Sequence, residues 1–336
     1  MYDEIIKEIK SNLSGNPEKD RIYLVEQMEK YKNHEYGPEI VRELARLMWD
    51  CLSDEEKEAF ARASDEENYV RDAFEEAYFY VQNQDLKTAL NKLDSFFNSF
   101  SLGFQDDKVN EYHSFSNPIE EILFRECIGT DKEIRFIPPE KPYENIHYLY
   151  GSLLIEFGRL DEAEAPLDYA LKLNPVNCGS LFERAEIFKN KKDFKSFLDY
   201  TTKALEFAYS SQSLARAYRN LGFYFIEKEN FELSTALFNY SLSIELNPMA
   251  FSELEYMKSL GQEYDVDEER MIELLKENNI QIGPNPLIFN ILAQLIMEAE
   301  MNQNYNALLY FYNILYDLTK DEEVLEKIND IKSKLE

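Results

Sequence analysis

The sequence predicts an all-α protein, a solenoid of helix pairs preceded by a helical N-terminal segment. Apolar residues recur at three- and four-residue steps through most of the chain, which places them on one face of successive helices. Small residues recur at Gly151, Ala185 and Gly222, spaced first by 34 and then by 37 residues. A repeat of this length on helical segments is typical of solenoids, in which each helix pair packs on its neighbours.

Composition narrows the classes of function. The chain of 336 residues contains 36 Lys and Arg against 65 Asp and Glu, a net charge of -29. A surface of this sign repels phosphate backbones, so we expect no nucleic-acid partner. No run of about 18 apolar residues occurs, so we expect no membrane-spanning helix.

Cysteine usage bears on the compartment. Cys51, Cys127 and Cys178 lie far apart, which fits neither a disulfide framework nor a zinc site. Free thiols fit a reducing cytosol. The charged start MYDEIIKEIK has no apolar h-region, so a secretory signal is not expected. Together these features predict a cytoplasmic protein.

No catalytic or cofactor site is predicted. His34, His113 and His147 are isolated from one another and lack the spacing of metal ligands. Neither a glycine-rich nucleotide motif nor a nucleophile elbow occurs. We therefore expect a protein that is not an enzyme and that has no catalytic residues, no metal and no cofactor.

The N-terminal part is expected to be helical without following the repeat. Residues 1–66 would form either a small bundle or a cap on the first repeat, and 67–100 a divergent helix pair. The expected N-terminal helices span 2–13, 17–32, 38–52 and 54–63. Residues 101–143 interrupt the rhythm as an insertion, in which NPIEEILFRECI predicts a short helix capped by Asn117 and KEIRFIPPEKPY predicts extended backbone.

Residues 144–173 give the clearest helix pair. The first helix is expected to end at Gly158, where a left-handed residue is needed. Asp161 is a candidate N-cap for the second helix. Pro175 ends that helix, because proline disfavours helical backbone in the residue before it.

Small side chains at Gly151 and Ala163 would let these two helices approach closely. The unit resembles a tetratricopeptide repeat, a helix pair of about 34 residues. The residues that carry the resemblance are Gly151, Leu154, Ala163, Leu167, Ala170 and Pro175, and weaker units follow around Ala185 and Gly222. The resemblance implies an array over 144–320, best matched at 144–248, closed by a capping helix at 321–336.

In this family the first helix of each pair lines a concave groove. The resemblance places there Tyr148, Ser152, Phe182, Glu186, Arg216, Arg219 and Phe223. Aromatic and arginine side chains dominate binding hot spots. Arg216 and Arg219, one turn apart in so acidic a chain, indicate an acidic group on the ligand. Alternatively, both arginines pair with Glu186 or other internal acids.

The resulting expectation is a scaffold or adaptor that binds an unidentified protein or peptide in this groove. Chaperone-binding members of the family hold a carboxylate with lysine and asparagine, where this chain has Tyr148 and Ser152, so we do not expect that clamp. The alternative is a bacterial-type regulator, with residues 1–66 as a helical effector segment and repeats that sense a peptide.

Overall fold

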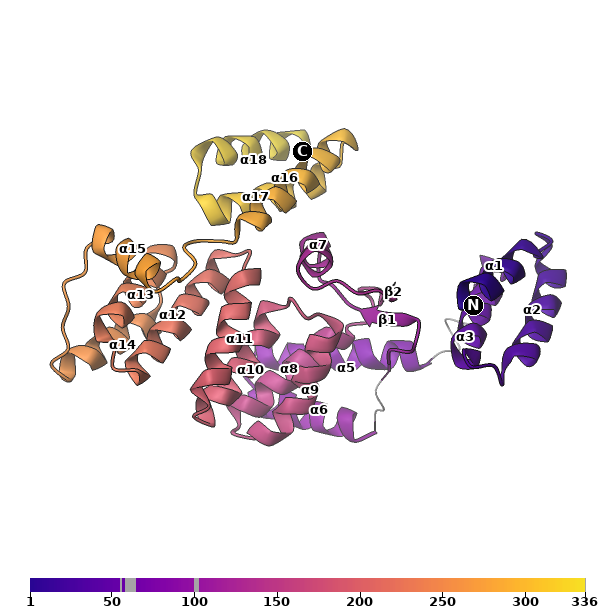
Figure 1. Cartoon of the computed structure of the whole chain (residues 1–336), viewed down its shortest axis with the longest axis horizontal. Helices are drawn as coiled ribbons and strands as arrows, with labels where there is room; N and C mark the ends of the chain where they lie inside the picture. Colours follow the sequence, from indigo (N-terminus) through magenta and orange to yellow (C-terminus); the bar gives the residue numbers. More distant parts are fainter. Residues whose placement is uncertain (55, 58–64, 100–102, 336) are drawn as a thin grey trace. The chain divides into compact units, whose positions relative to one another are not determined.

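The computed structural model describes residues 1–54, 56–57, 65–99 and 103–335 (Figure 1). Within these residues the chain forms seventeen helices and two short strands, so the predicted all-α class is confirmed for the described part. The chain divides into two compact units. Unit 1 comprises Met1–Ser114 and Thr130–Ile146, and unit 2 comprises Phe115–Gly129 and His147–Glu336.

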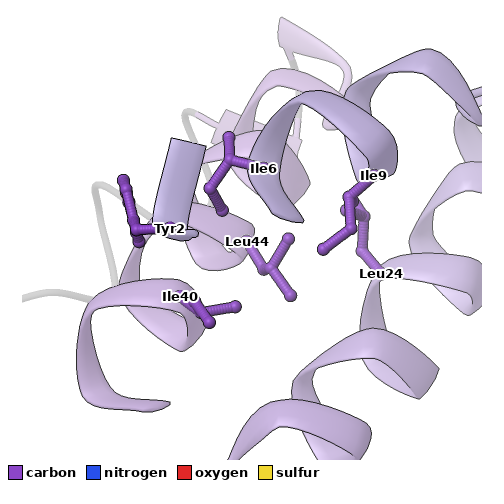
Figure 2. Packing of buried hydrophobic residues seen from close by; sticks show 6 residues of the cluster. All are labelled: Tyr2, Ile6, Ile9, Leu24, Ile40 and Leu44. Atoms are coloured by element: carbon purple, nitrogen blue, oxygen red, sulfur yellow. The ribbon is translucent and has the colours of Figure 1, made fainter. Parts of the chain in front are cut away.

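The first three helices of unit 1 share a core of their own. They are α1 (Tyr2–Ser11), α2 (Pro17–Tyr31) and α3 (Gly37–Asp50). Figure 2 shows the side chains that meet between them, which are Tyr2, Ile6, Ile9, Leu24, Ile40 and Leu44. Asn16 starts α2 by accepting a hydrogen bond from the Lys19 N–H. Most of the helix expected at 54–63 lies outside the described residues.

Unit 1 also contains a helix pair and a small parallel sheet. The pair is α5 (Asp65–Gln82) and α6 (Leu86–Ser99), and the sheet joins β1 (Asn110–His113) to β2 (Glu133–Phe136). The strand β2 agrees with the extended backbone predicted there. Arg135 on β2 reaches the buried Glu43 on α3 at 2.8 Å, and Lys10 on α1 reaches it at 2.9 Å. This carboxylate therefore ties the three-helix core to the sheet.

Unit 2 holds the rest of the chain. Its helices are α7 (Pro118–Cys127), the end of α8 (Tyr143–Glu156), α9 (Leu160–Leu173), α10 (Cys178–Asn190), α11 (Phe194–Phe207), α12 (Ser211–Glu227), α13 (Phe231–Ile244), α14 (Pro248–Ser259), α15 (Glu268–Glu277), α16 (Pro286–Met301), α17 (Tyr305–Thr319) and α18 (Glu322–Leu335). Neighbours pack as pairs, α10 with α11, α12 with α13 and α16 with α17. The pair α14 and α15 differs, because α15 packs on α13 instead of on α14.

The helix predicted inside the insertion is α7, and it packs within unit 2. Asn117 caps it, as expected, by accepting from the N–H groups of Ile119 and Glu120. The buried carboxylate of Glu120 accepts from the Tyr209 hydroxyl at 2.9 Å and from the Asn174 side-chain amide at 2.8 Å. Because both partners belong to turns between longer helices, this network fastens α7 to the body of unit 2.

The turn inside each helix pair has one recurring conformation. A residue with positive φ ends the first helix, and the next N–H bonds to the carbonyl five residues back at 2.8 to 2.9 Å. The positive-φ residues are Gln84, Gly158, Lys192, Glu229 and Gln303. In four of these turns the next residue is Asp85, Asp193, Asn230 or Asn304, whose side chain caps the second helix.

The predicted role of Gly158 is therefore confirmed, and that of Asp161 is wrong. Gly158 adopts φ +73 at the end of α8. Helix α9 begins after Arg159, which makes no side-chain cap bond. Asp161 lies one residue inside the helix, where it pairs with Lys191 at 2.6 Å. An acid in the first turn still interacts favourably with the helix dipole.

Small residues lie where the paired helices approach. A Cβ added to Gly151 would lie 2.5 Å from Leu167 Cγ, and one added to Gly222 would lie 2.9 Å from the Phe238 ring. Both partners follow their glycine by 16 residues. At the same offset in the next pair, Ala185 is followed by Thr201, and both are fully buried. The buried Phe197 lies at the place of Ala163, which is itself fully buried.

Candidate functional site

A pocket of about 220 Å3 opens in unit 2 between α10, α12 and the start of α14. Four of the seven side chains predicted for the groove line it, namely Glu186, Arg216, Arg219 and Phe223. The pocket is completed by Lys189, Asn220, Phe238, Asn247, Met249 and Glu253. The lining thus comes from helices far apart in sequence, and most of it from the first helices of successive pairs.

The other three predicted groove residues do not line this pocket. Tyr148 lies against Gly179, since a Cβ there would be 3.2 Å from the tyrosine ring. The Ser152 hydroxyl is buried and has no hydrogen-bond partner among the described residues. Phe182 is 2% exposed, so the expectation that it offers a groove surface is wrong. Its ring instead supports the Arg216 guanidinium, whose carbon lies 4.8 Å from the ring centroid.

Both arginines pair with acids of their own unit. Arg216 Nη2 lies 2.9 Å from Glu183 Oε1, and Arg219 Nη1 lies 3.0 Å from Glu245 Oε2. The Arg216 side chain remains 34% exposed, but that of Arg219 is only 13% exposed. The internal pairing left open by the sequence therefore occurs, with Glu183 and Glu245 as the partners in place of Glu186.

Arg216 keeps donors for a ligand. A guanidinium has five N–H donors in a planar fork, and in the described part of the chain Arg216 makes one hydrogen bond, to Glu183. The cation–π contact with Phe182 holds the group in place without using a donor. Arg216 can therefore bind a carboxylate while it remains paired with Glu183.

The third cation of the pocket stands over an aromatic ring. Lys189 Nζ lies 5.3 Å from the centroid of Phe223 and 2.5 Å from Glu186 Oε2. Phe223 in turn packs edge-on against the buried Phe197, with centroids 5.8 Å apart. One wall of the pocket is therefore aromatic, with the Lys189 cation and the Glu186 carboxylate beside it.

The side of the pocket formed by α14 was not predicted, because residues 248–277 show no clear repeat pattern. Asn247 caps α14 by accepting from the Met249 N–H at 2.9 Å. The sequence pair Asn247-Pro248 is a typical helix start, and it was the signal from which α14 could have been predicted.

Burial raises the pKa of the Glu253 carboxyl above its ordinary value, Lys189 opposes this shift, and Glu227 adds to it.

Cations and carboxylates meet at this site. Three cations and two carboxylates line the pocket, and two further carboxylates, on Glu183 and Glu245, pair with its arginines. The arrangement can accept an acidic group beside apolar surface from Phe223 and Met249.

Other chemistry has little support in the described residues. They contain no group of three or more His, Cys, Asp or Glu side chains arranged to hold a metal ion. Among the same residues, no helix combines the length and apolarity needed to cross a membrane. Cys178 is buried, and burial is the main reason that its thiol pKa is raised, so it is a poor nucleophile.

A scan against models of known protein families gave no match, and a search of curated proteins gave none either.

Proposed function

We propose that the protein is a helix-pair solenoid of the tetratricopeptide class that serves as a scaffold or adaptor. Support comes from the shared turn conformation at 158, 192 and 229, spaced by 34 and 37 residues. The turns at 84 and 303 each lie 74 residues from the nearest of these, about two repeats away. The close approaches at Gly151 and Gly222, each 16 residues before its partner, add a second periodic feature.

Its function is to bind a peptide segment of another protein in the pocket formed by α10, α12 and α14. The observation that carries this proposal is the convergence of Arg216, Lys189 and Phe223 beside the exposed Met249, from three helices that are not consecutive in sequence. Arginine and aromatic side chains of this kind supply most of the energy at protein interfaces. The spare donors of Arg216 favour a ligand that carries a carboxylate.

In this proposal the protein is cytoplasmic and non-enzymatic, and it works without a cofactor, nucleic acid or membrane. The acidic surface disfavours phosphate-rich partners. A helix-pair scaffold needs no chemistry beyond reversible binding.

The test is a selection of random peptides displayed on phage against the full chain. Selected peptides should share an acidic residue, and their affinity should fall about tenfold or more in Arg216→Ala. Arg270→Ala is the matched control, because Arg270 is also partly exposed and paired with glutamates but lies on α15 outside the pocket. Equal binding to both variants, or no selected peptides at all, would refute the proposed site.

A second candidate function is a regulator in which residues 1–66 act as a helical effector. The observation that favours it is the separate core of α1, α2 and α3, which needs no residue from unit 2. Addition of a selected peptide would then change the radius of gyration in small-angle X-ray scattering. A pure scaffold would bind the same peptide with unchanged scattering.

A further inference from the structure

Helix α14 leaves an apolar stripe uncovered. Met249, Tyr256 and Leu260 follow the spacing i, i+7 and i+11, with the carboxylate of Glu253 between them at i+4, which places them on one face or at its continuation just past the helix end. Met249 is 65% exposed, Tyr256 51% and Leu260 49%. The buried face of α14 carries Ala250, Leu254 and Met257, which pack with Phe238.

The stripe is open because α14 packs on α13 but not on the helix that follows it. In the pairs α10–α11, α12–α13 and α16–α17, each helix packs on the one that follows it. After α14 the chain instead runs through residues 260–267 to α15, which packs on α13. Both α14 and α15 thus pack on α13 (Figure 1). The place that a second helix would take beside α14 is therefore vacant in the described chain.

The stripe continues the pocket. Met249 and Glu253 belong to both, so the exposed side chains of Tyr256 and Leu260 extend the same surface along α14. At the other side of the pocket lie two cations, Arg216 beside its partner Glu183 and Lys189 beside its partner Glu186. One ligand that covers the stripe would thus bring its flank to these two cations.

We infer that this surface binds an amphipathic, acidic helix of a partner protein, which takes the position of the missing mate of α14. Apolar side chains of that helix, at i, i+4 and i+7, cover Met249, Tyr256 and Leu260, as in other helix-in-groove complexes. An acidic residue on its flank binds the spare donors of Arg216. The inference rests on the proposed peptide-binding function and adds the conformation and the charge of the ligand.

The probe is a fluorescein-labelled synthetic helix with Leu at i, i+4, i+7 and i+11 and Glu along one flank, titrated against the full chain by fluorescence anisotropy. A proline in its centre should abolish binding, since proline breaks a helix. Replacement of the flank Glu by Lys should weaken binding about tenfold. Because the chain has a net charge of -29, general electrostatic attraction would give the opposite preference.

The protein variants separate the two sides of α14. Met249→Ser together with Leu260→Ser should weaken binding of the probe about tenfold or more, because a desolvated apolar contact is lost. Phe251→Ser is the matched control, since Phe251 is equally exposed on α14 but lies on a different face. It should leave binding within about twofold of the parent. Equal losses in the two variants, or no loss in either, would overturn the inference.

Two outcomes assign failure to one proposal or the other. If phage-selected peptides lose affinity in Arg216→Ala but bind Met249→Ser/Leu260→Ser normally and tolerate proline, the groove remains and the helical ligand is excluded. If Arg216→Ala changes no affinity, the proposed function itself fails. Sedimentation velocity is run in parallel, because a dimer that Met249→Ser/Leu260→Ser dissociates would assign the stripe to a second copy and overturn the inference.

Discussion

Gly151→Ala is a sensitive probe of the packing between α8 and α9. The new Cβ would lie 2.5 Å from Leu167 Cγ and 2.7 Å from Cδ2, far inside contact distance, and Cγ is a branch point that cannot swing away freely. Overpacking of this kind costs about 1–3 kcal/mol. Helix propensity favours alanine over glycine by about 1 kcal/mol. The net expectation is a destabilisation of about 1 kcal/mol.

The effect of Gly151→Ala on stability should change sign when the Leu167 side chain is shortened. In a Leu167→Ala background, which itself costs about 2–5 kcal/mol, the three atoms nearest to the added Cβ are removed. Only the propensity gain then remains, so Gly151→Ala should stabilise that background by about 1 kcal/mol. The expected coupling energy between the two positions is about 1–3 kcal/mol.

The assay is hydrogen exchange read by mass spectrometry on peptides from α8 and α9, over a urea series. The only tryptophan, Trp49, lies in unit 1, so its fluorescence is an internal control that should not change. Gly222→Ala is a milder matched variant, because its Cβ would meet the end of the Phe238 ring at 2.9 Å. Stabilisation by Gly151→Ala in both backgrounds would refute the inferred close approach.

Three further outcomes are expected. Lys192→Gly should stabilise unit 2 by about 0.5–1 kcal/mol, since a positive φ of 59 strains a side chain that glycine lacks, and unchanged or lower melting would contradict this. Burial raises the Asp317 pKa, but hydrogen bonds from the Ser211 N–H and hydroxyl, together with the hydrogen bond and charge of Lys320, lower it more. The ionised Asp317 therefore adds to the free energy of unfolding above the unfolded pKa near 4, and this contribution is lost as pH falls through the lower folded pKa. The loss of stability in Asp317→Asn, measured by urea unfolding, should therefore shrink below about pH 4. A thiol reagent should modify the exposed Cys127 in the native protein and the buried Cys178 only after unfolding, and mass spectrometry that found the reverse order would contradict the fold.

The helix boundaries could be predicted where glycine and proline punctuate the chain. Gly158 and Pro175 placed the second helix of the best pair at 160–173, where α9 lies. The other turns were harder, because Lys192 and Glu229 occupy the left-handed position that glycine normally takes. The signal for these two turns was the Asp or Asn that follows each of them. Its side chain accepts a hydrogen bond from a backbone N–H in the first turn of the next helix and so marks where that helix starts.

The candidate site was predicted in part. Helical spacing identifies the face on which Arg216 and Phe182 lie, but it gives no measure of depth. Phe182 is buried and lies under the Arg216 guanidinium, and this depth depends on the distance between the two helices. Met249 and Glu253 were missed for another reason, since α14 has no regular mate and therefore no repeat pattern.

The most direct test of the central claim is a hydrogen-exchange footprint of the full chain with a phage-selected acidic peptide. Bound peptide should slow exchange in α12 and α14, which carry Arg216 and Met249, and leave α16, α17 and α18 unchanged. The slowing should vanish in Arg216→Ala and persist in Arg270→Ala. Protection confined to other helices, or protection in α12 and α14 that Arg216→Ala leaves intact, would contradict the account.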